Sequence, residues 1–251
     1  MSRALLSFVA TAPFPWNTPA VTAAGTRARV RAALTREIVD AARRHLATDG
    51  AAGLSLRAVA RELGMASSAV YRYFPSRDEL LTTLIVEAYD ALGAAAEEAA
   101  EEEAAAGNGL RARLHAACGA VRGWALAQPH EYALVYGSPV PGYAAPEATM
   151  GPASRVGVLL SRIVVDGIEA GVVDPGTGGA DATLTPGAAE SVGLPTDPDA
   201  SAAARAVQAW TALFGLVSFE LFGQTHNVVE RHEEFFRGAV ERLGDLLGLP
   251  A

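Results

Sequence analysis

Residues 55–81 read SLRAVARELGMASSAVYRYFPSRDELL, and this stretch decides the fold of the N-terminal part of the chain. Its first third has apolar residues at i, i+3, i+4 and i+7, a spacing that predicts one apolar face of a helix. These residues are Leu56, Val59, Ala60 and Leu63. We expect the helix to end at Gly64, because glycine tolerates the left-handed backbone that commonly follows a helix.

A second short helix is predicted directly after this turn. Ser67 or Ser68 can cap it, and Val70 and Phe74 face inward from it. Pro75 then stops the helix, since a proline disfavours helical backbone in the residue before it. Two helices joined by a tight glycine turn form a helix-turn-helix, whose second helix enters the major groove of DNA. The stretch therefore indicates a DNA-reading motif.

Serines also mark the starts of the neighbouring helices. Ser55 is placed to cap the first helix of the motif. Ser76 is predicted to cap a long helix at residues 77–106, with Glu79 at its third position as in a capping box. The far end of this long helix is rich in glutamate, which predicts an exposed face.

A family resemblance rests on residues 35–81, TREIVDAARRHLATDGAAGLSLRAVARELGMASSAVYRYFPSRDELL. The shared pattern is a helix ending in Asp49-Gly50, a Leu-Arg-x-Val-Ala-x-x-Leu-Gly core, and Val-Tyr-x-Tyr-Phe-x-Ser-Arg-x-x-Leu-Leu. The segment, about a fifth of the chain, resembles the N-terminal domain of TetR/AcrR-type transcriptional regulators. The resemblance implies a dimeric, DNA-binding repressor that responds to a ligand.

DNA recognition needs cations for phosphates and short polar or planar groups for base edges. The N-terminal residues of the second motif helix normally face the bases, and residues 25–31 form a basic arm that can reach phosphates or the minor groove. By the resemblance, Arg77 occupies the position of a phosphate-binding residue. For Tyr71, phosphate contact and packing inside the small domain both remain open. The predicted DNA contacts are Arg27, Arg29, Arg57, Ser67, Ser68, Ala69, Tyr71, Arg72, Tyr73 and Arg77.

The charge distribution supports this interpretation. The chain has a net charge of −8, but residues 26–78 contain ten arginines and five carboxylates. That segment therefore carries +5 and the remainder −13. A basic segment on an acidic chain suits a module that meets phosphate while the rest of the protein stays in solution.

The rest of the chain also predicts an all-α fold. Half of the 251 residues are hydrophobic, alanine dominates them, and alanine is the best helix former. No internal repeat and no alternating strand pattern is found. Together with the motif and the long helix, this makes about nine helices, the others being expected at about 33–48, 110–127, 130–136, 152–170, 201–222 and 231–247.

The predicted domains are a disordered extension at 1–25, a helix-turn-helix DNA-binding domain at 26–80, and an effector-binding and dimerisation domain at 81–251. The extension contains three prolines and has no helical period. Residues 171–200 are rich in Gly, Pro, Thr and Asp, so we expect a flexible loop there.

A second, shorter resemblance concerns residues 122–143, RGWALAQPHEYALVYGSPVPGY. This segment is similar to a C-terminal domain type of TetR-like regulators named for Trp, His and Gly, here Trp124, His130 and Gly137. A ligand site is usually an apolar cavity with a few polar groups, although any one of these side chains can instead belong to the core. The predicted pocket residues are Trp124, His130, Tyr132, Tyr136, Met150, Phe219 and His226.

A helix-turn-helix monomer buries too little surface for tight specific binding. We therefore expect a homodimer that reads two half-sites about 34 Å apart. The two last helices are apolar, and in the resembled family they pair across a twofold axis as a four-helix bundle. The same side chains can alternatively fill the core of the monomer. The predicted dimer interface comprises Trp210, Phe214, Val217, Leu221, Phe236, Val240 and Leu243.

The sequence lacks the patterns typical of an enzyme, a metal site or a cofactor site. It has no nucleophile elbow, phosphate-binding glycine loop or metal-spaced His/Cys pair, and the single Cys118 excludes an intramolecular disulfide. No apolar run approaches the length of a membrane span. We predict a cytoplasmic regulator whose partners are a double-stranded DNA operator, a second copy and a small hydrophobic effector. The alternative is a helical adaptor or ligand-binding protein without DNA regulation.

Overall fold

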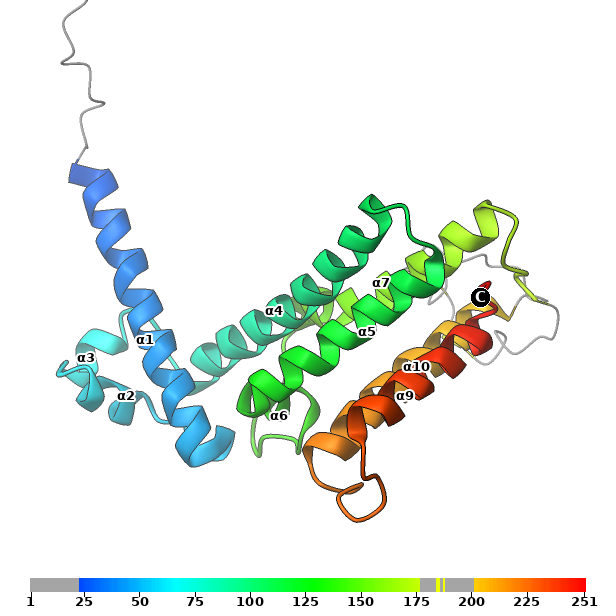
Figure 1. Ribbon diagram of the computed structural model, residues 1–251. Coiled ribbons are helices and arrows are strands. Elements are labelled where there is room, and N and C mark those ends of the chain that lie inside the picture. Colours follow the sequence, from blue (N-terminus) through cyan, green and yellow to red (C-terminus); the bar gives the residue numbers. More distant parts are fainter. Residues whose placement is uncertain (1–22, 177–183, 186, 188–200) are drawn as a thin grey trace, which may run out of the picture. The chain divides into compact units, whose positions relative to one another are not determined.

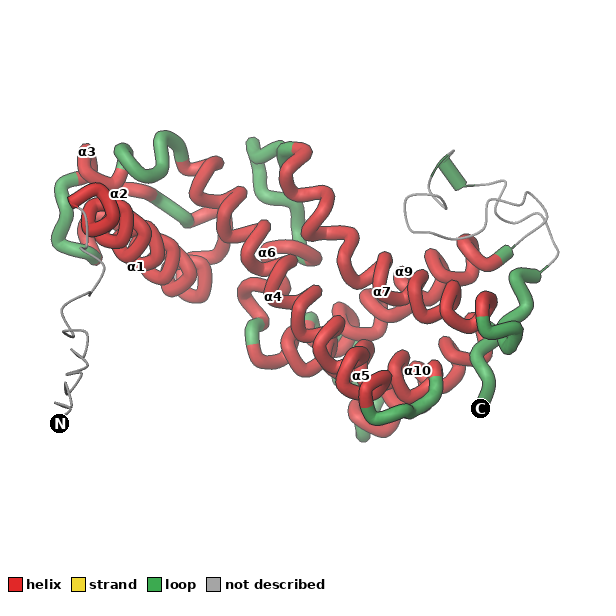
Figure 2. The backbone as a smooth tube through the Cα atoms, turned by 90° about the horizontal axis from the view of Figure 1, so that it is seen from above, coloured by secondary structure: helices red, strands yellow, loops and turns green. Residues whose placement is uncertain are grey.

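The computed structural model describes residues 23–176, 184–185, 187 and 201–251. Within these residues the chain forms helices and loops and no strand, which confirms the predicted all-α fold (Figures 1 and 2). The chain divides into two compact units, Met1–Glu37 and Ile38–Ala251.

Helix α1 spans Ala23–Gly53 and is longer than predicted at both ends. Residues 23–31 are helical, so the expected disorder up to residue 25 and the non-helical arm at 25–31 are wrong for them, whereas residues 1–22 lie outside the described part. Near its end the helix passes through Gly50, whose φ of 68° and ψ of 174° are not helical. Residues 51–53 therefore form a separate last turn.

The motif contains α2 (Leu56–Glu62) and α3 (Ser67–Val70), and α4 (Arg77–Ala105) follows it. The amide of Glu79 donates to Ser76 Oγ at 3.1 Å, which confirms the predicted cap of α4. Of the other two predicted caps, the position of Ser55 is confirmed without its hydrogen bond, and the cap of α3 is wrong. Ser55 precedes α2 in extended backbone but its side chain makes no capping bond, and Ala66 takes the cap position of α3.

Six further elements belong to the second unit. They are α5 (Leu110–Ala127), α6 (Pro129–Tyr136), the 3-10 helix η1 (Glu147–Thr149), α7 (Met150–Glu169), α9 (Ala202–Leu221) and α10 (His232–Leu247). Helix α4 packs along α5 and α7, while α9 packs against α7 and α10. Helix α10 also contacts α5, so these five helices enclose one apolar core.

Helix α9 is long and apolar enough to cross a membrane by length and composition, which corrects the expectation that no run approaches that length. Core helices of soluble proteins meet the same criterion. Leu213, Phe214 and Val217 of α9 are buried in the core shared with α7 and α10. The apolar character of α9 therefore has a structural explanation within this fold.

Residues 171–176, the start of the predicted flexible loop, are joined to the core through Val173. The amides of Val172 and Val173 both donate to the carbonyl of Gly167, and Val173 is buried. These contacts tie the start of the segment to the end of α7, the expected flexibility stays a prediction, and most of residues 177–200 lie outside the described residues.

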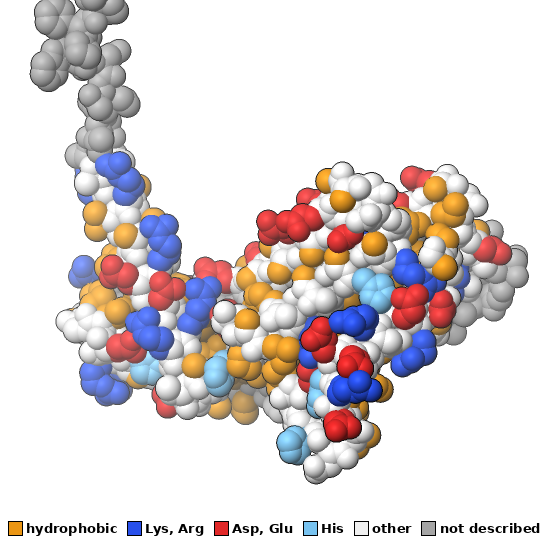
Figure 3. All heavy atoms as spheres, in the orientation of Figure 1, with side chains coloured by type: hydrophobic (Ala, Val, Ile, Leu, Met, Phe, Trp, Pro, Cys, Tyr) orange, Lys and Arg blue, Asp and Glu red, His pale blue; other side chains and the backbone are white. Residues whose placement is uncertain are grey.

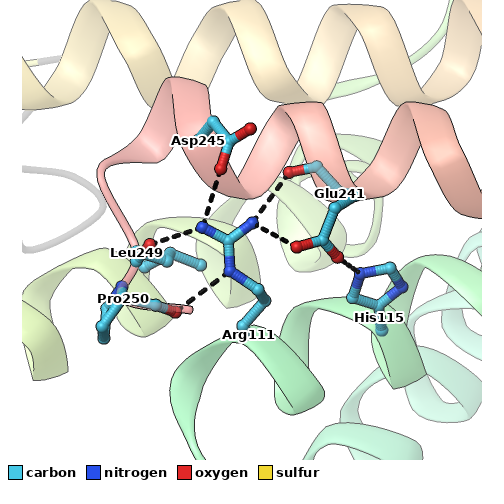
Figure 4. A network of polar contacts seen from close by, with 6 residues as sticks. All are labelled: Arg111, His115, Glu241, Asp245, Leu249 and Pro250. Atoms are coloured by element: carbon cyan, nitrogen blue, oxygen red, sulfur yellow. Dashed lines mark hydrogen bonds and ion pairs between the residues drawn. The ribbon is translucent and has the colours of Figure 1, made fainter.

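A guanidinium joins α5 to the end of α10 (Figure 4). Arg111 donates to the carbonyls of Leu249 and Pro250 and to the carboxylates of Glu241 and Asp245. Glu241 also accepts from His115 at 2.6 Å. This network closes the C-terminal turn against α5.

Candidate DNA interface and effector cavity

The two motif helices are held together by a small apolar core. Gly64 has a φ of 64°, the left-handed conformation expected for the turn, and the amide of Met65 donates to the carbonyl of Ala60 at 2.8 Å. Val70 of α3 and Phe74 after it are buried, as predicted, together with Val59 of α2. This packing fixes the outward face of α3.

Most of the predicted DNA contacts lie at the surface of the motif. Helix α3 is a single turn, and residues 71–73 continue it as a turn rather than as helix. Ser68, Tyr71 and Arg72 are exposed, as is Arg57 on α2, while Ser67, Ala69 and Tyr73 are partly buried. Tyr71 is 43% exposed, which favours a contact outside the domain over packing within it. The face thus offers hydroxyls and guanidinium groups.

Arg77 has a different environment from the other arginines of the motif. Its Nε donates to the carbonyl of Leu54 at 3.0 Å, and its Nη2 donates to the carbonyl of Ala51 at 2.7 Å. The guanidinium therefore binds the chain between α1 and α2. Two of its nitrogens are thus engaged by backbone carbonyls, and the contact of Arg77 with phosphate stays a prediction.

Arg27 and Arg29 lie in the first unit, on the helical part of α1 that precedes Ile38. Both are exposed, as are Arg31 and Arg36, and arginine side chains are spread along this helix (Figure 3). Residues 23–36 contain no carboxylate. A contact of Arg27 and Arg29 with DNA stays a prediction, now for a helix instead of an arm.

Charged contacts join the C-terminal half of α1 to α4 and α6. Arg43 Nη2 lies 2.7 Å from a carboxylate oxygen of Glu87, and its Nε lies 3.5 Å from Glu131. On the other side of α4, the hydroxyls of Thr82 and Tyr143 form a 2.9 Å hydrogen bond. These contacts hold the start of α4 beside α1, α6 and the loop after α6.

A cavity of about 570 Å³ lies among α4, α6, α7 and α9, and we call it the α7–α9 cavity. Its described lining contains no charged side chain. The lining residues are Tyr89, Val135, Tyr136, Met150, Ala153, Ser154, Gly157, Val158, Ser161, Leu184, Ala203, Ala206, Val207 and Trp210.

Two of the seven predicted pocket residues, Tyr136 and Met150, line the α7–α9 cavity. The other five do not, and their part in ligand binding stays a prediction. Tyr132 is fully buried and its hydroxyl lies 2.9 Å from Ser218 Oγ. Trp124 packs against the core at α5, whereas His130, Phe219 and His226 are exposed elsewhere. Aromatic character alone did not separate core from cavity.

The inner wall of the cavity is aromatic. The ring of Tyr136 stacks on Phe214 with centroids 4.1 Å apart, and Trp210 meets Phe214 edge-on at 6.2 Å. Burial raises the pKa of Tyr136, and it also raises the pKa of Tyr89. Both phenols are therefore neutral near pH 7, and the cavity presents an uncharged surface.

The predicted dimer residues point mostly into the monomer. Phe214, Val217, Phe236, Val240 and Leu243 are buried in the core, and Leu221 packs partly against it. Trp210 lines the α7–α9 cavity instead. The alternative, that these side chains fill the core of the monomer, therefore describes most of them. They lie on the faces of α9 and α10 that pack against α5 and α7.

The surface between the same two helices is apolar and open, and two of the predicted dimer residues, Phe236 and Leu243, line it although they are mostly buried. A groove of about 480 Å³ runs between α9 and α10, and we call it the α9–α10 groove. Phe219 and Phe235, which line it, are 56% and 46% exposed. Leu216, Gly215 and Ala239 also line it, whereas Arg242 and Glu220 supply charge.

Comparison with known proteins identifies the family. A family model described as "Bacterial regulatory proteins, tetR family" matches residues 38–84. A second, described as "Tetracyclin repressor-like, C-terminal domain", matches residues 114–243. The chain belongs to the TetR family. It is accordingly a DNA-binding transcriptional regulator, as the motif predicted.

Similar proteins in mycobacteria are also named as helix-turn-helix transcriptional regulators. The HTH-type transcriptional regulators Rv1816 of Mycobacterium tuberculosis and Mb1846 of Mycobacterium bovis are each 40% identical over 213 residues. The matches cover 80% of this chain and 86% of each relative.

Solved structures share the TetR-family fold. The crystal structure of the regulatory protein SCO4313 has a TM-score of 0.66 and 34% identity, covering 88% of this chain and 98% of that one. A Rhodococcus sp. RHA1 protein of unknown function has a TM-score of 0.64 and 27% identity, covering 87% and 96%.

The sequence analysis missed most residues of the α7–α9 cavity, although the sequence contains a signal for them. The α7 residues that line it follow helical spacing from Met150 to Ser161, and those of α9 do so from Ala203 to Trp210. Many of them are small, such as Gly157 and Ala206. In this fold these small side chains leave the space of the cavity between α7 and α9, whereas most of the predicted aromatic residues lie outside it.

Proposed function

We propose that this protein is a cytoplasmic, homodimeric repressor that leaves its operator when a small apolar molecule fills the α7–α9 cavity. One observation carries the proposal. Helix α4 starts at the DNA-reading motif, and its residue Tyr89 lines the cavity. A single helix is therefore in contact with both sites, and a ligand that changes the position of α4 changes the motif.

The outward face of α3 is the proposed DNA contact. Arg72 and Tyr71 are exposed there beside Ser68, and this combination suits phosphates and base edges. Gel-shift and footprinting assays on DNA flanking the protein's own gene test the proposal. Arg72→Ala should weaken binding and reduce the salt slope by about one. Arg162→Ala, at an exposed site on α7, is the matched control and should leave both unchanged.

The α9–α10 groove is the proposed dimer contact, with a second copy of this chain as its occupant. Exposed Phe219 and Phe235 supply apolar area, and the small residues Gly215 and Ala239 permit close helix approach. Phe219→Glu should shift the protein from dimer to monomer in analytical ultracentrifugation. Val228→Glu changes an 80% exposed residue outside the groove and should remain dimeric. A monomeric wild type would refute the proposal.

A clamp between α7 and α4 supports the coupling of ligand to DNA. Arg155 of α7 donates to Asp90 at 2.9 Å and to Glu97 at 3.0 Å, and both acceptors lie on α4. Its side chain crosses Gly93, where a Cβ would lie 2.8 Å from it. The wall of the cavity is thereby tied to α4, so displacement of α7 is transmitted along that tie.

A thermal-shift screen of apolar molecules, followed by operator binding with each hit, tests the response. A hit that stabilises the protein should raise the dissociation constant for DNA, because it favours a conformation whose motifs no longer match the operator. Ligands that bind without any effect on DNA affinity would refute effector release. Ligand binding without any DNA binding would favour the helical adaptor.

A further inference from the structure

One polar atom in the α7–α9 cavity wall lacks a partner. The indole Nε1 of Trp210 is buried, yet it donates to no acceptor in the described part of the protein. Three hydroxyls of the cavity lining donate to backbone carbonyls, and none of them accepts a hydrogen bond from this N–H. Ser161 donates to Gly157 at 2.9 Å, Ser154 to Gly151 at 2.8 Å, and Tyr89 to Val135 at 3.2 Å.

An unpaired donor in an apolar wall is unfavourable, because it has lost water without gaining an acceptor. A bound molecule with an oxygen at this place removes that deficit. The indole N–H is a donor only, so its partner must be an acceptor. This requirement selects a carbonyl or ether oxygen and gives no advantage to a pure hydrocarbon.

The charge of the wall restricts the ligand further. The described lining contains no charged side chain that could pair with an anionic or a cationic ligand, and its phenols, Tyr89 and Tyr136, are neutral. Arg155 of α7 already binds Asp90 and Glu97. A charged ligand would therefore lose its hydration without compensation, which is costly in an apolar site.

The backbone of α7 leaves room beside the indole. Position 157 is a glycine, and the nearest side-chain atoms to a Cβ placed on it belong to the ring of Trp210, with Cδ1 at 3.8 Å and Nε1 at 3.9 Å. These are ordinary van der Waals distances, so a methyl group fits there without strain. The same space is available to a ligand oxygen next to the N–H.

We propose that the α7–α9 cavity takes an uncharged, largely apolar molecule with a carbonyl or ether oxygen, which accepts a hydrogen bond from Trp210 Nε1. This inference rests on the proposed effector site and names the chemistry that the site selects. Trp210 is then the residue that distinguishes an oxygen-bearing ligand from a hydrocarbon of the same shape.

Matched probes test this selectivity on the full-length protein. Benzophenone and diphenylmethane differ by a carbonyl in place of a methylene group, and methyl decanoate and undecane form an aliphatic counterpart. In isothermal titration, at least one oxygen-bearing probe should bind about three- to tenfold more tightly than its hydrocarbon partner. Decanoate, the charged analogue, should bind more weakly than methyl decanoate.

Variants locate the effect at the indole. Trp210→Phe should reduce the ratio of affinities within a pair to about one, because phenylalanine keeps the ring and removes the donor. Trp124→Phe, at the half-buried tryptophan of α5 outside the cavity, should leave the ratio unchanged. Gly157→Ala fills the space beside Nε1 and should lower the ratio while the protein keeps its thermal stability.

Three results would overturn the inference: equal affinities within both pairs, a ratio that survives in both Trp210→Phe and Gly157→Ala, or tighter binding of decanoate. These outcomes are independent of the repressor proposal, because they are measured without DNA. Conversely, selective binding of benzophenone with no change in operator affinity would support the ligand chemistry and refute effector release.

Discussion

The helix-turn-helix and the α7–α9 cavity lie in one chain but are encoded in different ways. The motif is contained in residues 55–81, and its contacts follow from local spacing, one glycine turn and one proline. The cavity is built from α4, α6, α7 and α9, whose lining residues are separated by more than a hundred positions. A local motif is legible in sequence, whereas a tertiary site depends on which helix faces meet.

The largest expected effect separates core from surface within the motif. Phe74 is 5% exposed and Tyr71 is 43% exposed. Phe74→Ala should destabilise the motif by about 4 kcal/mol, because it leaves a cavity between α2 and α3. Amide hydrogen exchange in α2 measures this loss. Tyr71→Ala is the control and should change exchange little; equal losses would contradict the assignment of Phe74 to the core.

The next effect separates two arginines that are five residues apart. Arg77→Ala removes three donor contacts to the carbonyls of residues 51, 52 and 54 and should cost about 2 kcal/mol of motif stability. Arg72→Ala should cost less than about 0.5 kcal/mol. Urea unfolding followed by amide hydrogen exchange in the motif measures the loss of stability in both variants. A lower salt slope of DNA binding in Arg77→Ala would show that this side chain also contacts phosphate.

A smaller effect concerns the clamp between α7 and α4. Gly93→Ala places a Cβ 2.8 Å from the Arg155 side chain, and this crowding should outweigh the helix preference of alanine by about 1 kcal/mol. Gly119→Ala on α5 is the matched control, since a Cβ there meets nothing within 4 Å. That variant should gain stability. Calorimetry measures the two midpoints, and a gain in both would contradict the close approach at Gly93.

The smallest effect is a pH dependence confined to the body of the protein. Burial raises the pKa of the Cys118 thiol to about 12, and burial, opposed by a hydrogen bond from Ser218, raises that of Tyr132 to about 12. The unfolded chain loses these protons first, so its ionisation stabilises the unfolded state. The free energy of unfolding should therefore be constant near pH 7 and fall as the pH rises through about 9 toward 12.

Urea unfolding at several alkaline pH values measures this decline. Cys118→Ala should show a smaller decline that begins nearer pH 10, where only the phenols contribute. An unchanged decline in this variant would assign it to other groups.

The comparison also explains which predictions succeeded. The motif, the Ser76 cap, the all-α class and the family were predicted from sequence, because each depends on neighbouring residues. The pocket and dimer predictions stay predictions, but most residues of each set lie outside the α7–α9 cavity and the α9–α10 groove, respectively, for a common reason. Large apolar residues at helical spacing, such as Phe214 and Val240, fill the core of the monomer, so their size did not reveal a site.

The backbone contacts of Arg77 escaped the sequence analysis for a separate reason. Gly50 interrupts α1, and this turn brings the carbonyls of residues 51–54 to the start of α4. Sequence spacing within the motif contains no information about that approach. Likewise, residues 25–31 were predicted to be an arm because they are rich in arginine, whereas they lie in the first turns of α1.

The unbroken course of α4 has a mechanical consequence. Asp90, the first acceptor of the Arg155 clamp, lies thirteen positions after Arg77 on α4. At a rise of 1.5 Å per residue, the two residues are about 20 Å apart along the helix. If the clamp is the pivot of a lever, a tilt of about 10° moves the Arg77 end by about 3.4 Å, one base-pair step of B-DNA. A rotation of that size is small enough for a ligand to produce by filling a cavity. It is also large enough to take a recognition helix out of register with its bases.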